Sequence, residues 1–461
     1  MAALAVALVV GTAAAECPPA DESASRTLIL AMDGVPYRAM RAAREMGAFA
    51  GWGPTRPLVS TFPSMTNVGF SAILEPFGAQ RIPGYEIRYY DPESNRVTGG
   101  GVSSAKFEWR RHFQIELRGL WAKSGLYMTP RTSARKELRH IERWALEAPD
   151  DVMLALLSST DALTHLCGDD ALVRVLVEFS ERLDELRRRH RETRGRPLEV
   201  VLLSDHGNTG PKVRRPEGLA RTLRRAGLRP AGHLQRPGDV IAPTYGIVGY
   251  GALYLEPHHA ETAARAILEH EGVFLAAWKR DEHVVTLVTR DGEGRIEWRD
   301  GPPGRFLAYR PVDGDPLGLG STMARMRQAG VLDAQGYASR SDWFDWTALE
   351  RYPDAVARLV DSLDGVWVGN AATVIFSFEP GYAWGLKPAE VAAWIRAGRL
   401  EETHGGLDRQ SSWGFFTASD PARDSPPAVR AERALAAWAP ADPCTTASLM
   451  EFSSPDLHGR P

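Results

Sequence analysis

Three stretches of the chain share one pattern of hydrophobic and polar positions: a short apolar run ends on an aspartate. These stretches are TLILAMD (27–33), VMLALLSSTD (152–161) and EVVLLSD (199–205). Near-continuous apolar runs without polar alternation are typical of strands that are buried on both faces of a parallel sheet. Because such sheets bind ligands at the carboxyl ends of their strands, the three aspartates predict a site at that edge.

A helix is predicted between the second and third of these runs. Apolar residues recur there at helical spacing, and the polar stretch ERLDELRRRH supplies a solvated face. The apolar positions are Leu172, Val175, Leu176, Phe179, Leu183 and Leu186. The order strand, helix, strand indicates an α/β fold with a mostly parallel sheet.

The composition changes after residue 210, where Arg, Gly and Pro become frequent. Strand-like stretches follow, and DGEG (291–294) between two of them is typical of a hairpin turn. The stretches are YGALYLE (250–256), HVVTLVTR (283–290) and RIEWRD (295–300). We interpret 211–360 as an insertion or cap that continues the core, and 26–210 and 361–440 as the catalytic core. The apolar stretch VWVGNAATVIFSF (366–378) begins the second part of that core.

Size and charge exclude few functions. The 461 residues, 44% of them hydrophobic, suffice for a large core, and 55 basic against 58 acidic residues give a formal net charge of -3. This balance gives no global electrostatic reason to expect a nucleic-acid polymer or an anionic membrane as partner. The sequence does not indicate an oligomeric state.

The N-terminus predicts export. An apolar run at 2–10 precedes GTAAAEC, so residues 1–15 are interpreted as a signal peptide of a periplasmic or secreted protein. The run is too short to cross a bilayer, and we expect no transmembrane segment. Three cysteines allow one disulfide at most: pairing of Cys17 with Cys444 stays open, and Cys167 is expected to be a buried thiol.

Acidic and imidazole side chains cluster at the predicted strand ends. Asp205 and His206 follow the third run directly, while Asp161 and His165 stand four residues apart, a spacing that places both on one helical face. Aspartate and neutral histidine are natural ligands of zinc and similar divalent ions. His404 in THGG adds an imidazole beside two glycines that permit a tight turn. Each motif alone is also explained by ordinary capping or loop residues.

A further candidate lies in PSMTNVGFSAIL (63–74), where Ser64, Thr66 and Asn67 stand at the start of a helical pattern. A helix N-terminus offers free N–H groups and a favourable dipole to a phosphate. Simple helix capping by Ser64 or Thr66 explains the same residues. A threonine hydroxyl needs activation by a base or a metal before it can act as a nucleophile.

Taken in chain order, these motifs resemble the type I phosphodiesterase and nucleotide pyrophosphatase family of the alkaline phosphatase superfamily. The resemblance covers about 27–407. It implies a three-layer α/β sandwich with helices on both faces of the sheet, an inserted α+β region, and two divalent metal ions, expected to be zinc, with manganese or iron left open. It also implies hydrolysis of a phosphodiester or pyrophosphate bond in a small-molecule phosphate ester, through a covalent phospho-threonine on Thr66. The implied ligands are Asp33, Thr66, Asp205 and His206 for one ion, and Asp161, His165 and His404 for the other.

Substrate class is less closely defined. PSMTN also resembles the nucleophile stretch of phosphonoacetate hydrolase, and the family commonly carries a phosphate-binding Asn where this chain has Gly69. Asn67 is the candidate for that substrate-binding role. A phosphomonoesterase, a phosphonate hydrolase and a metal-binding relative without turnover remain alternatives. A sulfatase or a phosphomutase fits less well, because the nucleophile motifs of those relatives differ.

Overall fold

The computed structural model describes residues 25–100, 107–116, 126–302, 304–385, 400–423 and 425–439. The expected signal peptide, Cys17 and Cys444 lie outside these ranges. Among the described residues, no helix combines the length and the apolar character needed to cross a membrane.

The first sheet has six strands in the order β17-β2-β16-β6-β1-β5. They are β1 (Arg26–Met32), β2 (Arg56–Val59), β5 (Val152–Leu157), β6 (Leu198–Leu203), β16 (Trp413–Ala418) and β17 (Val429–Arg430). Strand β1 lies between β5 and β6 and runs parallel to both, and β16 is antiparallel to β6 and β2. The three apolar runs that end on aspartate are therefore confirmed as neighbouring parallel strands.

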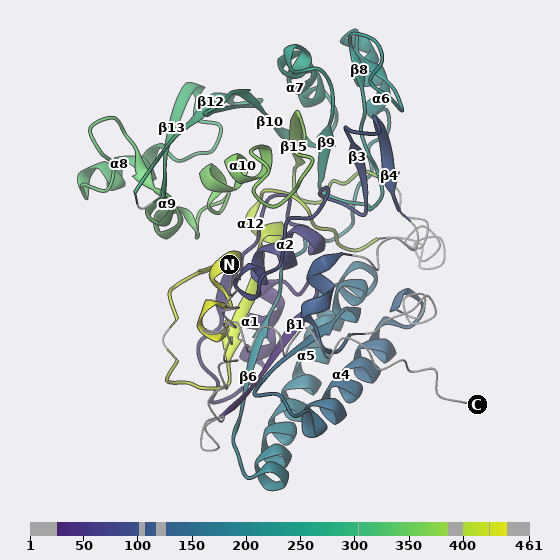
Figure 1. Cartoon of the computed structure of the whole chain (residues 1–461), viewed down its shortest axis with the longest axis vertical. Helices are drawn as coiled ribbons and strands as arrows, with labels where there is room; N and C mark the ends of the chain where they lie inside the picture. The colour runs from purple at the N-terminus through teal and green to yellow at the C-terminus, as the bar shows by residue number, and fades with distance from the viewer. Residues whose placement is uncertain are drawn as a thin grey trace, which may run out of the picture.

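Both faces of β1 are buried, which explains the absence of polar alternation in its sequence. Leu28 and Leu30 belong to the core shared with α1 (Tyr37–Glu45), α4 (Pro130–Glu147) and α5 (Ser159–Arg194). Ile29 and Ala31 belong to the core on the opposite face, which includes α2 (Thr66–Ile73). The predicted α/β class, with a parallel-rich sheet and helices packed against it, is confirmed. The long helices α4 and α5 lie side by side in the lower half of the molecule (Figure 1).

The second sheet has seven strands, all antiparallel, in the order β14-β13-β12-β11-β10-β15-β9. They are β9 (Tyr250–Leu253), β10 (Val273–Asp281), β11 (Val284–Thr289), β12 (Gly292–Gly301), β13 (Gly304–Gly314), β14 (Ala338–Ser339) and β15 (Val374–Phe378). Thr289 pairs with Gly292, so the hairpin predicted at DGEG forms. Strand β15 comes from the stretch 366–378, which the sequence groups with the core, yet it pairs with β9 and β10.

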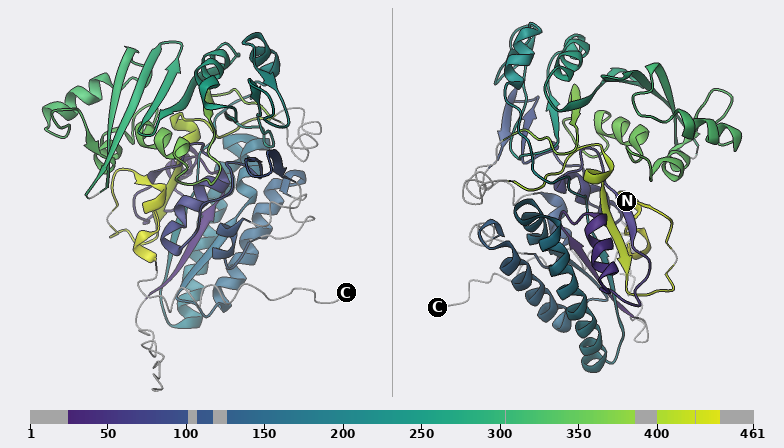
Figure 2. Two further views of the ribbon diagram at one scale, coloured as in Figure 1. Left: turned by 45° about the horizontal axis from the view of Figure 1, so that its top comes forward. Right: turned by 180° about the vertical axis from the view of Figure 1, so that it is seen from behind.

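Shorter elements complete the second sheet's half of the molecule, at the top of Figure 1 and in both views of Figure 2. The helices are α6 (Leu219–Arg225), α7 (Ala260–Leu268), α8 (Gly320–Gln328), α9 (Arg340–Thr347) and α10 (Ala355–Leu363). The strand pairs are β3 (Arg88–Asp91) with β4 (Arg96–Gly99), and β7 (Arg229–Pro230) with β8 (Asp239–Val240). The short helix α12 (Arg409–Ser412) precedes β16.

A buried arginine on α10 joins this half of the molecule to the loops of the first sheet. Arg358 is 4% exposed and donates hydrogen bonds to Thr61 O at 2.7 Å and to Ser64 Oγ at 3.0 Å. It also donates to Leu407 O at 3.3 Å. One guanidinium therefore fixes the loop that precedes Thr66 and the loop that follows His404.

Candidate metal and phosphoryl-transfer site

Three carboxylates lie at one edge of the first sheet because their strands are parallel and in register. Met32 pairs with Leu157, and Ala31 pairs with Leu203, so Asp33, the start of α5 and Asp205 follow adjacent strand ends. Asp33 N–H donates to Leu157 O at 3.0 Å, and Gly34 N–H donates to Asp205 Oδ1 at 3.2 Å. These bonds tie the three ends together at the carboxyl edge, where open α/β sheets place their ligands.

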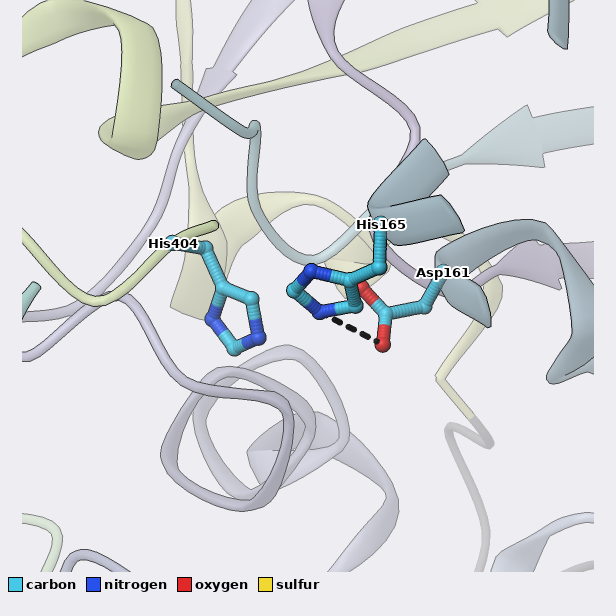
Figure 3. A group of neighbouring side chains, drawn as sticks. All are labelled: Asp161, His165 and His404. Atoms are coloured by element: carbon cyan, nitrogen blue, oxygen red, sulfur yellow. Dashed lines mark ion pairs between the residues drawn. The ribbon is translucent and has the colours of Figure 1, made fainter. Parts of the chain in front are cut away.

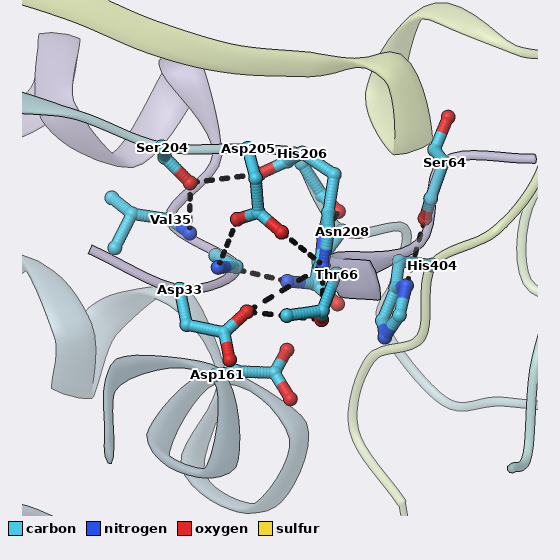
Figure 4. Close-up of polar contacts among 12 residues, drawn as sticks. Asp33, Val35, Ser64, Thr66, Asp161, Ser204, Asp205, His206, Asn208 and His404 are labelled. Carbon is cyan, nitrogen blue, oxygen red and sulfur yellow. Dashed lines mark hydrogen bonds and ion pairs between the residues drawn. The ribbon is translucent and has the colours of Figure 1, made fainter. Parts of the chain in front are cut away.

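Thr66 is the first residue of α2, and its hydroxyl faces this edge. Its Oγ1 donates to Asp33 Oδ1 at 3.1 Å and lies 3.2 Å from His206 Nε2 (Figure 4). Asn67, the next residue, is 8% exposed at the same helix end. The hydroxyl thus lies within hydrogen-bond distance of one carboxylate and one imidazole, the residue types that hold or deprotonate a nucleophile.

Each of the three histidines of the site has its Nδ1 atom against a backbone carbonyl oxygen. The Nδ1 atom of His165 lies 2.6 Å from Glu402 O, that of His206 lies 2.9 Å from Gly207 O, and that of His404 lies 2.9 Å from Ser64 O. A carbonyl oxygen only accepts, so Nδ1 carries the proton and Nε2 keeps its lone pair. This arrangement is typical of metal-ligating histidines, whose other ring nitrogen is held by a carbonyl or carboxylate.

Two groups of side chains could each hold one cation. The ligand atoms of Asp161, His165 and His404, drawn in Figure 3, lie within 4.8 Å of one another. The ligand atoms of Asp33, Asp161 and His206 also lie within 4.8 Å of one another. Asp161 Oδ2 is 3.2 Å from His165 Nε2, and Asp205 Oδ2 is 3.3 Å from His206 Nε2. The rings of His206 and His404 stack with centroids 3.9 Å apart. Asp161 belongs to both groups, so these five residues adjoin one another. Thr66 and Asp205 belong to neither group but lie beside His206.

The donor set fits divalent cations. Asp161 Oδ1 and Asp205 Oδ2 are buried and have no hydrogen-bond partner among the described residues. Buried polar atoms are almost always paired, so these two oxygens, of which Asp205 Oδ2 lies 3.3 Å from His206 Nε2, fit a partner of another kind such as a cation. Carboxylate oxygens and imidazole nitrogens, with no thiolate, suit zinc and also manganese or iron.

The electrostatics of the residues agree with this fit. Burial, followed by repulsion from Asp205 and Asp161, raises the pKa of Asp33 well above its ordinary value, and burial does the same to the pKa of Asp205. Burial acts to raise the pKa of Asp161 as well, but the neighbouring His165 outweighs it and lowers that pKa. Burial lowers the pKa of His206 to about 4 and that of His404 well below its usual range. The imidazoles of His206 and His404 are thus held neutral, the form in which they bind metals.

Two glycines pack closely against aspartates of the site. A Cβ atom on Gly34, which has φ of +63°, would lie 2.3 Å from Asp161 Oδ1. A Cβ atom on Gly69 would lie 3.2 Å from Asp205 Cβ and 3.4 Å from Asp205 O. A side chain at position 69 would therefore contact Asp205 more closely than ordinary van der Waals packing, and Asp205 would have to move by a few tenths of an ångström.

The expectation for Cys167 is wrong, because this thiol is exposed. Asp161 and His165 lie one helical turn apart on the buried face of α5. Residue 167 is two positions beyond His165, about 200° around a helix, so its side chain points to the opposite face.

Sequence reasoning missed Ser204 and Asn208. Ser204 Oγ accepts from Val35 N–H at 2.8 Å and donates to His206 O at 3.0 Å. Asn208 Nδ2 donates to Gly34 O at 2.7 Å. Both orient the loop that carries Asp33 and Gly34. The signal was their position within SDHGN, but a Ser or Asn beside a ligand is too common to be singled out by spacing.

Comparisons with known proteins give no match in sequence and weak matches in structure. No family model and no curated protein matches the chain. The structure of human ectonucleotide pyrophosphatase/phosphodiesterase 5 matches with a TM-score of 0.46 and 11% identity, over 88% of this chain and 92% of that one. The murine protein of the same name matches with a TM-score of 0.42 and 10% identity, over 85% and 87%. Both bear the name of the family that the motif order resembles.

Proposed function

We propose that the protein is a two-metal hydrolase of phosphodiester or pyrophosphate bonds in small-molecule phosphate esters, with Thr66 as its nucleophile. The observation that carries the proposal is the position of Thr66 Oγ1, 3.1 Å from Asp33 Oδ1 and 3.2 Å from His206 Nε2. Around it lie two overlapping groups of carboxylate and imidazole ligands. A hydroxyl that only capped a helix would have no need of such surroundings.

The residues suggest how the reaction would proceed. In the proposed assignment, Asp33, Thr66, Asp205 and His206 would hold one cation, and Asp161, His165 and His404 would hold the other. Two such cations would act as Lewis acids that favour the ionised hydroxyl and neutralise charge on the phosphate oxygens. Thr66 Oγ1, after losing its proton to solvent, would form a bond to phosphorus as the bond to the leaving oxygen breaks. The oxygen of a water molecule would then bond to phosphorus as the bond to Thr66 Oγ1 breaks, and a proton from that water would restore the Thr66 hydroxyl. Asn67 and the N-terminus of α2 would contact the phosphate oxygens.

The test is hydrolysis of the p-nitrophenyl ester of a nucleoside 5′-monophosphate by purified protein with Zn²⁺. Thr66→Ala is expected to lower the rate on the order of 10³-fold or more, as loss of a covalent nucleophile does. Thr193→Ala is the matched control, because Thr193 is exposed and its hydroxyl bonds only to carbonyls of its own helix. Equal rates for the wild type and Thr66→Ala would contradict the nucleophile assignment.

Parallel assays separate the alternatives. A phosphate monoester and phosphonoacetate are tested beside the diester, and a higher kcat/KM for either would move the function to a phosphomonoesterase or a phosphonate hydrolase. Retained nucleotide without product would indicate a binding protein. Gly69 stands where the family commonly carries a phosphate-binding Asn, and its packing against Asp205 gives this glycine a structural reason that does not depend on a loss of turnover.

A further inference from the structure

A partly buried group of charged residues lies behind His165 and His404. Arg38 on α1 donates from Nε to Asp169 Oδ2 at 2.5 Å and from Nη2 to Asp169 Oδ1 at 3.2 Å. Its Nη2 also donates to Glu402 Oε2 at 2.5 Å, and its Nη1 donates to Asn208 O. The side chain of Glu402 is 6% exposed, whereas those of Asp169 and Arg38 are 30% and 36% exposed. We call Arg38, Asp169 and Glu402 the clamp.

The clamp is bonded to the candidate ligands through the backbone. Glu402 O is the acceptor for His165 Nδ1 at 2.6 Å, and Glu401 N–H donates to His165 O at 2.9 Å. Glu402 is also two residues before His404 on the same loop. One segment therefore orients the ring of His165 and positions the backbone that carries His404.

The helix α5 is interrupted where the clamp meets it. Gly168 has φ of +69° and ψ of 179°, which are not helical values, and the helix resumes at Asp169. This break exposes Asp169 N–H, which donates to Glu402 Oε1 at 3.2 Å. A carboxylate at the start of a resumed helix is favoured by the free N–H groups and the helix dipole. Without Arg38, however, the carboxylates of Asp169 and Glu402 would repel each other.

We propose that Arg38, Asp169 and Glu402 are positioning residues that set the affinity of the Asp161, His165 and His404 group for a divalent cation. The inference rests on the proposed function, since it presumes that this group holds a metal. Arg38 holds the loop of Glu402 against α5, and this contact keeps the acceptor of His165 Nδ1 in place. Loss of such supporting partners typically lowers metal affinity about 10–100-fold. The residues carry no reacting atom.

The experiment measures Zn²⁺ affinity by chelator competition in the full chain, together with the visible absorption of the Co²⁺-loaded protein. Arg38→Met is expected to weaken one of two bound ions about 10–100-fold and leave the other near its wild-type affinity. The Co²⁺ bands of one site should change accordingly. The Zn²⁺ affinity of Arg38→Lys at the affected site should lie between those of the wild type and Arg38→Met, because an ammonium keeps the charge and loses the bidentate geometry.

Arg41→Met is the matched control. Arg41 lies one turn from Arg38 on α1, and its pair with Glu45 is exposed, so wild-type affinity for both ions is expected. The free energy of unfolding of the metal-free proteins is measured in parallel. If Arg38→Met does not fold, Asp169→Asn removes the same bidentate contact while keeping the size of the side chain, and the same loss at one site is expected.

The outcomes separate this inference from the proposed function. Wild-type affinity for both ions in the variants, with or without a loss of metal-free stability, would overturn the positioning role alone. Equal weakening of both ions would also overturn it, because Glu402 of the clamp bonds directly to His165, whereas the clamp reaches the other group only through Asn208 O, two residues after His206. A wild-type protein that binds no divalent ion would overturn both proposals.

Discussion

The Nδ1 atom of His404 lies 2.9 Å from the carbonyl oxygen of Ser64, two residues before Thr66. The same two segments form an antiparallel bridge between Ser64 and Gly405. These contacts connect residues 340 positions apart in the chain and join the candidate nucleophile to a candidate metal ligand. The loop of Thr66 and the loop of His404 therefore form one structural unit.

This relationship predicts the effect of removing the imidazole. His404→Ala should lower the stoichiometry of tightly bound Zn²⁺ from two to about one, with affinity at the affected position reduced more than the roughly 10–100-fold typical of supporting residues. Metal analysis after dialysis against a weak chelator measures this change. His140→Ala, at an exposed position on α4, should leave both ions bound. Two ions bound to His404→Ala would contradict the ligand assignment.

A second prediction concerns the room that Gly34 leaves for Asp161. In Gly34→Ala the new Cβ would lie 2.3 Å from Asp161 Oδ1, so the carboxylate must move out of the site. Gly51→Ala is the control, because Gly51 has a similar φ of +77° and nothing within 4 Å of an added Cβ. Both variants incur the cost of an alanine in the left-handed region, about 1–2 kcal/mol.

The comparison of the two variants isolates the collision. We expect Gly34→Ala to lose a further 1–3 kcal/mol or so of unfolding free energy, the typical cost of overpacking. Metal affinity should also fall by at least about tenfold, whereas Gly51→Ala should keep it. Denaturant unfolding and chelator competition give the two quantities. Equal losses in both would mean that Asp161 accommodates the methyl group.

The three aspartate-ended strands and the helix between two of them could be predicted from sequence, because β1 is buried on both faces and is unbroken apolar sequence from Leu28 to Met32. Asp161 and His165 could be paired because helical spacing is a local rule. The pairing of β15 with β9 and β10 could not be predicted from sequence, since an apolar run does not specify which of two sheets it joins. The same holds for Cys167, whose exposure depends on which face of α5 is buried.

The supporting residues of the site were beyond sequence reasoning for another reason. Arg38, Asp169 and Glu402 lie far apart in the chain, and each is an ordinary charged residue in its local context. Their role arises only from the register of α1, α5 and the loop before His404. Likewise, nothing local marks Gly69 as a position that packs against Asp205.

That packing gives a third prediction. An alanine in place of a glycine within a helix would by propensity alone stabilise it by about 0.5–1 kcal/mol. At Gly69 the added methyl would meet the buried Asp205 at 3.2 and 3.4 Å, and overpacking costs about 1–3 kcal/mol. We therefore expect Gly69→Ala to be less stable than the wild type and Gly69→Asn to be less stable still, with lower activity in both.

Gly232→Ala serves as its control, since an added Cβ there has nothing within 4 Å and Gly232 has no left-handed φ. The midpoint temperature of thermal unfolding of Gly232→Ala should equal or exceed that of the wild type. A stabilised, fully active Gly69→Asn would show that Asp205 tolerates a side chain at this position, and would restore Asn as an acceptable residue there.

A last prediction concerns a buried carboxylate beneath α5. Glu137 on α4 is 2% exposed, and it accepts hydrogen bonds from Ser158 N–H and Ser159 N–H, both at 3.0 Å. Burial raises the pKa of Glu137 to about 7, which outweighs the opposing effect of these hydrogen bonds, and Glu116 adds to the rise. The native state thus holds this proton more tightly than the unfolded chain, whose glutamate has a pKa near 4.5.

This difference in pKa makes the free energy of unfolding depend on pH. At pH values below about 4.5 both states are protonated, and between about 4.5 and 7 the unfolded state releases the proton first, so stability falls as pH rises. A shift of this size corresponds to about 3 kcal/mol.

Glu137→Gln removes the titration, so its loss of unfolding free energy from pH 5 to pH 8 should be smaller than that of the wild type by up to that amount. Measurements in chelator remove the pH dependence of metal binding, and the exposed Glu147→Gln on the same helix should keep the wild-type slope. Identical slopes for the wild type and Glu137→Gln would mean that Glu137 is ionised in the native state throughout this range.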